Sequence, residues 1–265
     1  MQRDLTSRIV LDVTEPSDLL FAIAVSGHYT PAREQFTATL NGAPVAEHEI
    51  LGPTGSRLHR VASTKGELVV EYSAMIPGPG AAPVGREHDL LVAQLPSRYA
   101  ESDVLRPTAL AEFAGITDHA ELLGAVASWV GTHLSYVPGS SLPTDGAVRT
   151  LLARQGVCRD YAHLCVALLR ALGIPSRLVS VYAPGLFPMD FHAVAEAWVD
   201  GEWRVVDATT LAPRSTLVRI ATGRDAADTA FLTTISGGVN LLELTVTAVV
   251  DVLPDDDITQ LVTIG

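Results

Sequence analysis

The sequence is most constrained at residues 158–172, where apolar side chains recur at helical spacing directly after a cysteine, Cys158. Apolar residues three or four positions apart form one face of a helix, and here they are Leu164, Ala167, Leu168 and Ala171. Gly173 follows the last of them and Pro175 comes two positions later, which is a common way for a helix to end. The pattern therefore predicts a helix that begins at Cys158, buries one face and stops before Gly173.

Three strand-like segments follow this helix, at residues 177–182, 192–199 and 202–207. Asp200-Gly201 separates the last two, and an Asp-Gly pair between strand patterns is a strong hairpin signal. His192 begins one of these strands and Asp207 ends the other. Residues of an antiparallel hairpin pair symmetrically about its turn, so we expect His192 and Asp207 at the same end, within about one pleat of each other.

A cysteine at the start of a helix is well placed for chemistry. The helix dipole and the unpaired N–H groups of the first turn favour the thiolate, which is the form that attacks carbonyl carbon. Cys158, His192 and Asp207 also follow the chain order of a papain-type triad of nucleophile, base and orienter. We expect Asp207 to accept a hydrogen bond from one imidazole nitrogen and to leave the other for the thiol. The sequence thus predicts acyl transfer at Cys158, although spacing alone does not establish that the thiol reaches His192.

The neighbouring histidine and the second cysteine are better explained as structural. Cys165 lies in the middle of the apolar face, and His163, five residues past Cys158, points about 140° away from it on a helix. Seven residues of helix separate the two cysteines by about 10.5 Å, more than the ~7 Å that a disulfide spans. No group of side chains has the spacing of a metal site, so we expect neither a metal nor another cofactor.

The oxyanion of an acyl-transfer reaction needs hydrogen-bond donors, and the backbone N–H of Cys158 is a natural one. The sequence leaves the second donor open. Gln155 and Tyr136 precede the nucleophile and are candidates for it. Trp198 is a further candidate for the substrate cleft, although Trp198 and Trp203 are also well suited to packing in a core.

The chain changes its pattern at a segment rich in proline and glycine, and we assign residues 77–86 to a linker. Before it, residues 1–76 contain short apolar or alternating runs separated by turn signals such as Asn41-Gly42, as in a small β-sandwich domain. After it, residues 87–265 contain helices and then antiparallel strands. We assign the last strand, 241–252, to this catalytic core, although it could pair with either domain. The predicted fold class is α+β, with the cysteine-bearing helix packed on an antiparallel sheet.

Composition argues against several kinds of partner. The 265 residues include 18 Lys and Arg against 30 Asp and Glu, a formal net charge of −12, which disfavours binding of nucleic acid. The N-terminal residues have no apolar signal-peptide core, and no apolar run is long enough to span a membrane. Two cysteines without a disulfide framework fit a reducing compartment. We therefore expect a cytoplasmic protein with no nucleic-acid or membrane partner.

The motifs around these three residues resemble the bacterial transglutaminase-like superfamily over roughly residues 90–235. They are the segments 156–164, 168–177, 190–193 and 206–209, together with Trp203. The resemblance implies a papain-like α+β core in which Cys158 is the nucleophile, His192 the base and Asp207 the orienter. Residues 1–76 are also similar to the β domain that precedes this core in some bacterial members.

The sequence departs from the family pattern at two positions. The tryptophan expected two residues after the histidine is Val194, and the proline expected after the aspartate is Ala208. Neither is a triad position, but both bear on the shape of the substrate cleft. Because the family contains peptidases, amidases, transamidases and inactive relatives, the resemblance does not fix the reaction.

The favoured interpretation is a thiol hydrolase, a cysteine peptidase or amidase, that acts on a peptide or protein substrate. Hydrolysis is favoured over transfer to an amine because transamidation requires a cleft that excludes water. Val194 removes one large shielding ring, and the chain is only 6% aromatic. The alternatives are a protein-glutamine transamidase, a non-catalytic peptide-binding protein that retains the fold, and a scaffold that acts through the β domain. The sequence leaves the oligomeric state open.

Overall fold

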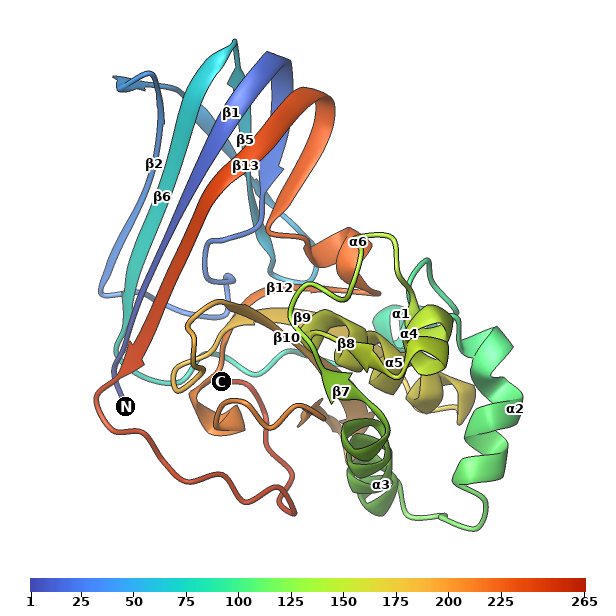
Figure 1. The fold of residues 1–265 in the computed structure, drawn as a ribbon. Coiled ribbons are helices and arrows are strands. Elements are labelled where there is room, and N and C mark those ends of the chain that lie inside the picture. Colours follow the sequence, from blue (N-terminus) through green and yellow to red (C-terminus); the bar gives the residue numbers. More distant parts are fainter.

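A computed structural model describes residues 1–265. A tall, curled β-sheet stands beside a unit of helices packed on a second sheet (Figure 1). Both sheets are antiparallel, and the helices lie with the second one, as the predicted α+β class requires. None of these helices combines the length and the apolar character that crossing a membrane demands.

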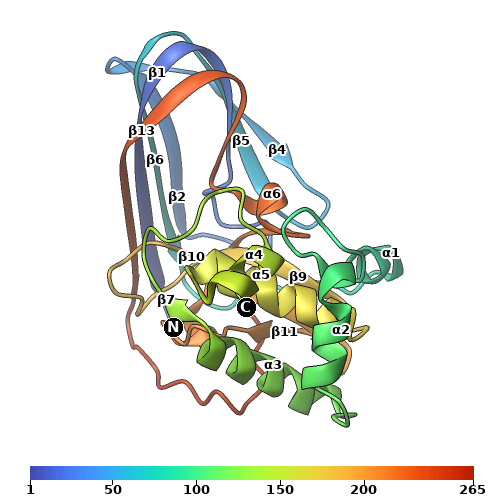
Figure 2. The ribbon, with the colours of Figure 1, turned by 45° about the vertical axis from the view of Figure 1, so that its right-hand side comes forward.

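The first sheet contains seven strands in the order β3-β2-β6-β1-β5-β4, with β13 paired to β1. Their bounds are β1 Arg3–Phe21, β2 Arg33–Leu40, β3 Ala43–Pro44, β4 Glu47–Leu51, β5 Arg57–Ser63, β6 Gly66–Ile76 and β13 Leu232–Val250. One edge of β1 pairs first with β6 and then with β5, while the other edge pairs with β13 along the whole strand. As a result β1 and β13 curl over at the far end of the sheet, and β5 and β4 fold back toward β6 and β2 (Figure 2).

Local sequence explains how these strands form. Alternate residues of β1 and β6 are buried, which is the pattern of strands with one face on a core. The predicted hairpin at Asn41-Gly42 is confirmed, because Leu40 pairs with Ala43. Asn41 and Gly42 have φ values of 50° and 81°, the left-handed conformation that a two-residue hairpin turn requires and that asparagine and glycine tolerate best.

The second unit holds a four-stranded sheet in the order β11-β10-β9-β12. Its strands are β9 Ser176–Tyr182, β10 Phe191–Val199, β11 Glu202–Val206 and β12 Val218–Gly223. Two short parallel strands lie beside it, β7 Ser135–Tyr136 and β8 Gln155–Gly156. The helices are α1 Glu87–Val92, α2 Ser102–Glu112, α3 His119–His133, α4 Ala147–Ala153, α5 Cys158–Ala171 and α6 Ala226–Thr229, with a short 3-10 turn at Arg214–Thr216.

Helix α5 is the centre of this unit. It is buried on nearly all sides, and its apolar residues share one cluster with residues of α2, α3 and β10. The predicted helix and the predicted hairpin after it are both confirmed, since α5 begins at Cys158 and β10 and β11 pair across Asp200-Gly201. Asp200 and Gly201 have φ values of 54° and 77°, again the left-handed pair of a tight hairpin.

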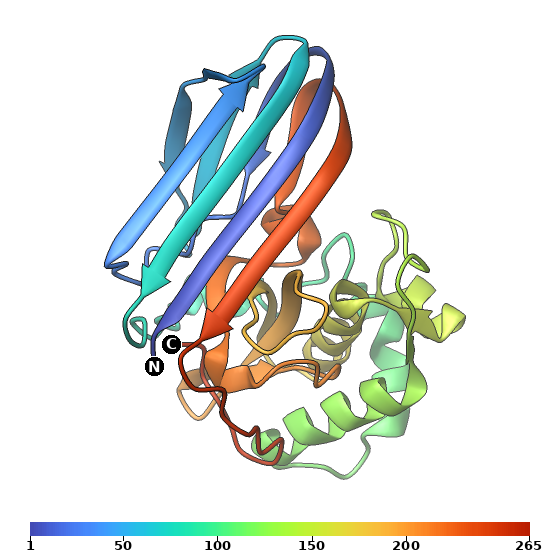
Figure 3. The same ribbon diagram turned by 60° about the vertical axis from the view of Figure 1, so that its left-hand side comes forward.

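The C-terminal strand requires a correction. The expectation that residues 241–252 belong to the catalytic core is wrong, because β13 pairs with β1, and residues from both ends of the chain build the first sheet (Figure 3). The inward side chains Val246 and Ala248 are buried in the core of that sheet. An apolar alternation shows which face of a strand is buried but not which partner the strand joins, and this is why the assignment failed. The division of the chain into independent domains at residues 77–86 stays a prediction.

The two sheets share apolar packing. Tyr182 of β9 and Val218 of β12 belong to the same buried cluster as the inner face of the first sheet. The hydroxyl of Tyr182 donates to the carbonyl of Ile23 at 2.9 Å and lies 3.1 Å from the hydroxyl of Ser7. This buried contact joins β9 to the N-terminal sheet. The loop after β9 leads to β10 and His192.

Cutting the chain between the two units should therefore not separate them. We expect a protein with a protease site inserted in residues 78–84 to remain one particle after cleavage, because β1 still pairs with β13 and the apolar cluster still spans both parts. Size-exclusion chromatography of the cut protein, with denaturing electrophoresis to confirm cleavage, measures this. Elution of two separate folded fragments without denaturant would contradict the shared core.

Candidate active site

The residues before Cys158 form a compact turn that fixes the start of α5. Val157 is the N-cap residue, and the Asp160 carboxylate accepts its backbone N–H at 2.8 Å and the hydroxyl of Ser141 at 2.9 Å. A side chain on Gly156 would lie 2.6 Å from the Cβ of Asp160, so the turn closes only with glycine there. Gly156 and Asp160 thus place Cys158 at the first helical position, where it feels the helix dipole.

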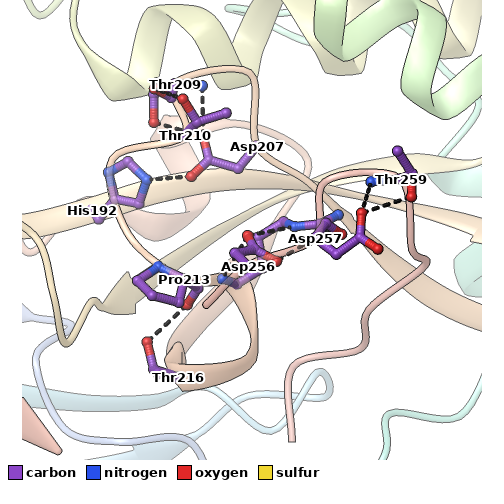
Figure 4. A network of polar contacts seen from close by, with 10 residues as sticks. His192, Asp207, Thr209, Thr210, Pro213, Thr216, Asp256, Asp257 and Thr259 are labelled. Atoms are coloured by element: carbon purple, nitrogen blue, oxygen red, sulfur yellow. Dashed lines mark hydrogen bonds and ion pairs between the residues drawn. The ribbon is translucent and has the colours of Figure 1, made fainter. Parts of the chain in front are cut away.

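His192 and Asp207 meet at the open end of the β10–β11 hairpin. Nε2 of His192 lies 2.9 Å from Oδ2 of Asp207 (Figure 4). The other oxygen, Oδ1, accepts the backbone N–H of Thr209 at 2.9 Å and its hydroxyl at 2.7 Å. Ala195 pairs with Val206, so Asp207 is the first residue beyond the paired strand and reaches diagonally to His192.

The environment of this pair sets its charge. Burial lowers the pKa of His192, but the charge of Asp207, its hydrogen bond and the Cys158 thiol outweigh burial and raise that pKa to about 10. Burial also opposes ionisation of Asp207, while His192 and the two hydrogen bonds from Thr209 bring the pKa of this carboxyl below its usual value. The favoured state at neutral pH is therefore imidazolium beside carboxylate.

The Cys158 thiol is also a neighbour of the imidazole. It is half-buried, and it is one of the groups that interact with His192 and raise its pKa. Nδ1 of His192 is buried and has no hydrogen-bond partner of ordinary geometry elsewhere in the chain. With Nε2 held by Asp207, Nδ1 is the nitrogen available to exchange a proton with the sulfur.

Tyr136 is also brought to the thiol. The short parallel strands pair Tyr136 with Gly156, two residues before Cys158. Burial and the neighbouring Cys158 thiol raise the pKa of Tyr136 to about 12, and the backbone N–H of Cys158 also interacts with it. The phenol therefore keeps its proton at neutral pH and can donate a hydrogen bond near the sulfur.

The other two residues considered from sequence lie differently. Gln155 is exposed on β8, and its side chain makes no hydrogen bond within the chain. Trp198 lies six residues along β10 from His192, about 20 Å at the rise of a strand. Its ring packs edge-on against Trp203 at 5.4 Å and covers Gly85. The structure does not bring Trp198 to the thiol, because the side chain belongs to the packing at the far end of the hairpin.

Cys165 and His163 have the structural settings that their helical positions predicted. Cys165 is fully buried, and burial raises the pKa of its thiol. His163 is also fully buried, stacks on Tyr99 at 5.4 Å and accepts the backbone N–H of Ala226 at Nε2. Burial lowers the pKa of His163 to about 3, so the imidazole is neutral in the folded protein.

A cavity of about 750 Å³ adjoins the site on the side of Asp207. Helix α3, the loop after β11 and the C-terminal tail line it, and Tyr136 and Tyr161 connect it to the neighbourhood of Cys158. Arg214 holds the tail here by ion-pairing with Asp256 at 2.9 Å. No group of three or more His, Cys, Asp and Glu side chains is arranged to hold a metal ion.

Sequence reasoning missed Thr209 and Asp160, which orient Asp207 and the start of α5. Both have local signals. Asp-x-Thr and the helix position three residues after the N-cap are common settings for hydrogen bonds between a side chain and nearby backbone. Asp190 was also missed as a neighbour of the site, although it lies directly before β10 and only two residues before His192.

Replacing His163 with glutamine should flatten the acid side of the stability curve. Its pKa of about 3 in the folded protein lies below the ordinary 6.5, so between these values the unfolded chain binds more protons than the native state. The contribution of neutral His163 to the free energy of unfolding is complete above about pH 6.5 and falls as the pH drops toward 3. Glutamine keeps an acceptor for Ala226 but does not titrate.

Urea unfolding at a series of pH values measures this effect, with the exposed His48→Gln as the matched control. The control should follow the wild-type curve. A His163→Gln curve with the wild-type slope between pH 6.5 and 4 would show that another group causes the acid sensitivity.

Comparison with known proteins agrees with this geometry. Residues 108–208 match the model of the transglutaminase-like superfamily, and this range contains Cys158, His192 and Asp207. The solved structure described as a "Putative Cysteine Protease" from Cytophaga hutchinsonii is similar over 97% of this chain and 92% of that chain, with 32% sequence identity and a TM-score of 0.87.

Two curated relatives, both uncharacterized, are mycobacterial. A protein of Mycobacterium leprae is 26% identical over 219 residues, which is 78% of this chain and 71% of the relative. A protein of Mycobacterium tuberculosis is 34% identical over 143 residues, 48% of this chain and only 45% of that relative. The family match across the site and the end-to-end similarity to one solved structure together show that this protein belongs to the transglutaminase-like superfamily.

Proposed function

We propose that this protein is a thiol-dependent hydrolase of peptide or amide bonds, in which Cys158 is the nucleophile, His192 the general base and acid, and Asp207 the orienter. The observation that carries the proposal is the position of His192, with one nitrogen bonded to Asp207 and the other free beside Cys158. A raised pKa supports an imidazolium that stabilises a neighbouring thiolate. Membership of the superfamily supports the same roles.

In the acylation step, Sγ of Cys158 attacks the substrate carbonyl carbon, and the π electrons move to the oxygen. The backbone N–H of Cys158 and the hydroxyl of Tyr136 are the donors we propose for this oxyanion. His192 then gives its Nδ1 proton to the leaving nitrogen, the C–N bond breaks, and an amine departs from the thioester.

In the second step, His192 takes a proton from water while the water oxygen attacks the thioester carbonyl. The C–S bond breaks, the carboxylic acid leaves, and the proton returns to the thiolate–imidazole pair. Asp207 keeps the imidazole in one orientation and compensates its positive charge in both steps.

Hydrolysis rather than amine transfer is proposed because the site offers little shielding from water. Val194, in the place of the family tryptophan, is buried with Val179 and Val205 and contributes no wall to the cleft. Tyr136 is the aromatic ring next to the thiol, and it is exposed. An open thioester meets water far more often than an amine.

The three proposed residues should contribute unequally. Cys158→Ala and His192→Ala should each abolish turnover, because each removes a group that forms or breaks bonds. Asp207→Ala should keep roughly a hundredfold more activity than either, since this carboxylate only positions and stabilises the imidazolium. The Cys158→Ala, His192→Ala double variant should lose little beyond the single changes. Steady-state turnover of a peptide found by screening a peptide and amide library measures these differences.

His163→Ala is the matched control, because this histidine lies on the same helix as Cys158 but is buried away from it. In every folded variant that keeps Cys158, mild iodoacetamide treatment with peptide mapping should modify Cys158 and spare the fully buried Cys165. Near-normal turnover by His192→Ala, or preferential labelling of Cys165, would overturn the assignment.

Product analysis distinguishes water from amine as the acceptor. With a substrate in hand, we expect the free acid to remain the main product when a primary amine is added at moderate concentration. Mass spectrometry separates the acid from the amide. Amide as the dominant product would show that the protein is a transamidase, and no turnover of any peptide or amide would favour a binding protein that retains the fold.

A further inference from the structure

The peptide group that joins Ala208 to Thr209 links Asp207 to helix α3. Its N–H, on Thr209, donates to Oδ1 of Asp207 at 2.9 Å (Figure 4). Its carbonyl, on Ala208, lies against Gly131 of α3, where a Cβ would be 2.7 Å from the oxygen. The N–H and C=O of a trans peptide point in opposite directions within one rigid plane. One flat group therefore lies between the helix backbone and the Asp207 carboxylate.

This close approach is the reason for a glycine at position 131. A carbon atom does not normally come within 2.7 Å of a carbonyl oxygen, so any side chain here would displace the peptide or the helix. The backbone of Gly131 is helical and lies outside the left-handed region, so its conformation does not require glycine. Alanine would also be the better helix former. The contact with Ala208 is what an added side chain would disturb.

Neither side of this contact is free to move away. Val130 of α3 is fully buried in the apolar cluster around α5. The segment that follows the peptide is held at Arg214, whose guanidinium and backbone N–H both bind Asp256. A side chain at Gly131 would therefore shift the peptide and, through its N–H, the Asp207 carboxylate.

We propose that Gly131 is a positioning residue that sets the orientation of the Asp207 carboxylate. By admitting the Ala208 carbonyl against α3, it fixes the place of the N–H that Asp207 accepts. This inference rests on the proposed function, in which Asp207 orients the base, and it adds α3 to the elements that support the site. Such support matters because a misplacement of about 1 Å can lower a rate by as much as a hundredfold.

Gly124 provides a matched control on the same helix. It lies seven residues before Gly131, about two turns away on the same face, and it lines the same cavity. A Cβ at Gly124 would meet nothing within 4 Å. Both glycines are exposed, so the two substitutions by alanine differ in the contact with Ala208.

Steady-state turnover of a peptide substrate is the first measurement. Gly131→Ala should lower kcat about ten- to a hundredfold and change KM less than about twofold, because the base is misoriented while the substrate keeps its contacts. Gly124→Ala should keep the wild-type kcat. In an Asp207→Asn background, Gly131→Ala should cost little more, because the charge that it positions is already gone. A merely structural loss would add to that of Asp207→Asn.

An NMR titration of the His192 ring reports the same effect without turnover. Burial lowers the pKa of His192, and the charge and hydrogen bond of Asp207 outweigh burial and raise that pKa to about 10. A displaced carboxylate raises it less, so the pKa should be lower in Gly131→Ala than in wild type or Gly124→Ala. Protection of the fully buried Cys165 from iodoacetamide shows that each variant is folded.

The outcomes separate the positioning role from the proposed hydrolase. Equal kcat for Gly131→Ala and Gly124→Ala overturns the positioning role and leaves the hydrolase intact, and so does an equal pKa of His192. Absence of turnover by wild type overturns the hydrolase, and the pKa of His192 in the two variants then decides the positioning role alone. An additive loss in the Asp207→Asn background, or a Gly131→Ala protein that does not fold, also overturns the positioning role, because the contact would then support the fold as a whole.

Discussion

The buried contact between His192 and Asp207 is the interaction on which the account of this protein depends. Both side chains are almost fully removed from water, where an isolated charge is costly, so neither tolerates ionisation without the other. Two hydrogen bonds from Thr209 satisfy the second oxygen of the Asp207 carboxylate. Burial by itself lowers the pKa of a histidine. The charge and hydrogen bond of Asp207 outweigh this effect and keep His192 protonated beside Cys158.

The rest of the fold holds the two sides of this contact in place. Glu196, four residues along β10 from His192, is fully buried and binds Arg177 of β9 and Arg219 of β12, which ties three strands together. Helix α5 packs on the same sheet and presents Cys158 from its first turn. The N-terminal sheet supports β9 and β12 from the other side through a shared apolar cluster. A small displacement of any of these layers would move the thiol relative to the imidazole.

Features with local signals could be predicted from sequence. The start of α5, its end before Gly173 and the turn at Asp200-Gly201 follow from residues within a few positions, and the hairpin then brings His192 to Asp207. Features set by long-range packing could not. Three features depend on contacts between distant segments. They are the pairing of β13 with β1, the pairing of Tyr136 with Gly156 between β7 and β8, and the packing of Trp198 away from the cleft. The spacing of residues did not predict that Cys158 lies beside His192. The family resemblance did.

The most direct test is an NMR titration of the His192 ring in wild type and in Asp207→Asn. In wild type the pKa of His192 should be about 10, far above the ordinary 6.5, because the carboxylate outweighs the effect of burial. In Asp207→Asn the buried ring loses that charge, and its pKa should fall well below the wild-type value. A wild-type ring that titrates near 6.5 and does not respond to the substitution would show that Asp207 does not maintain an imidazolium beside the thiol.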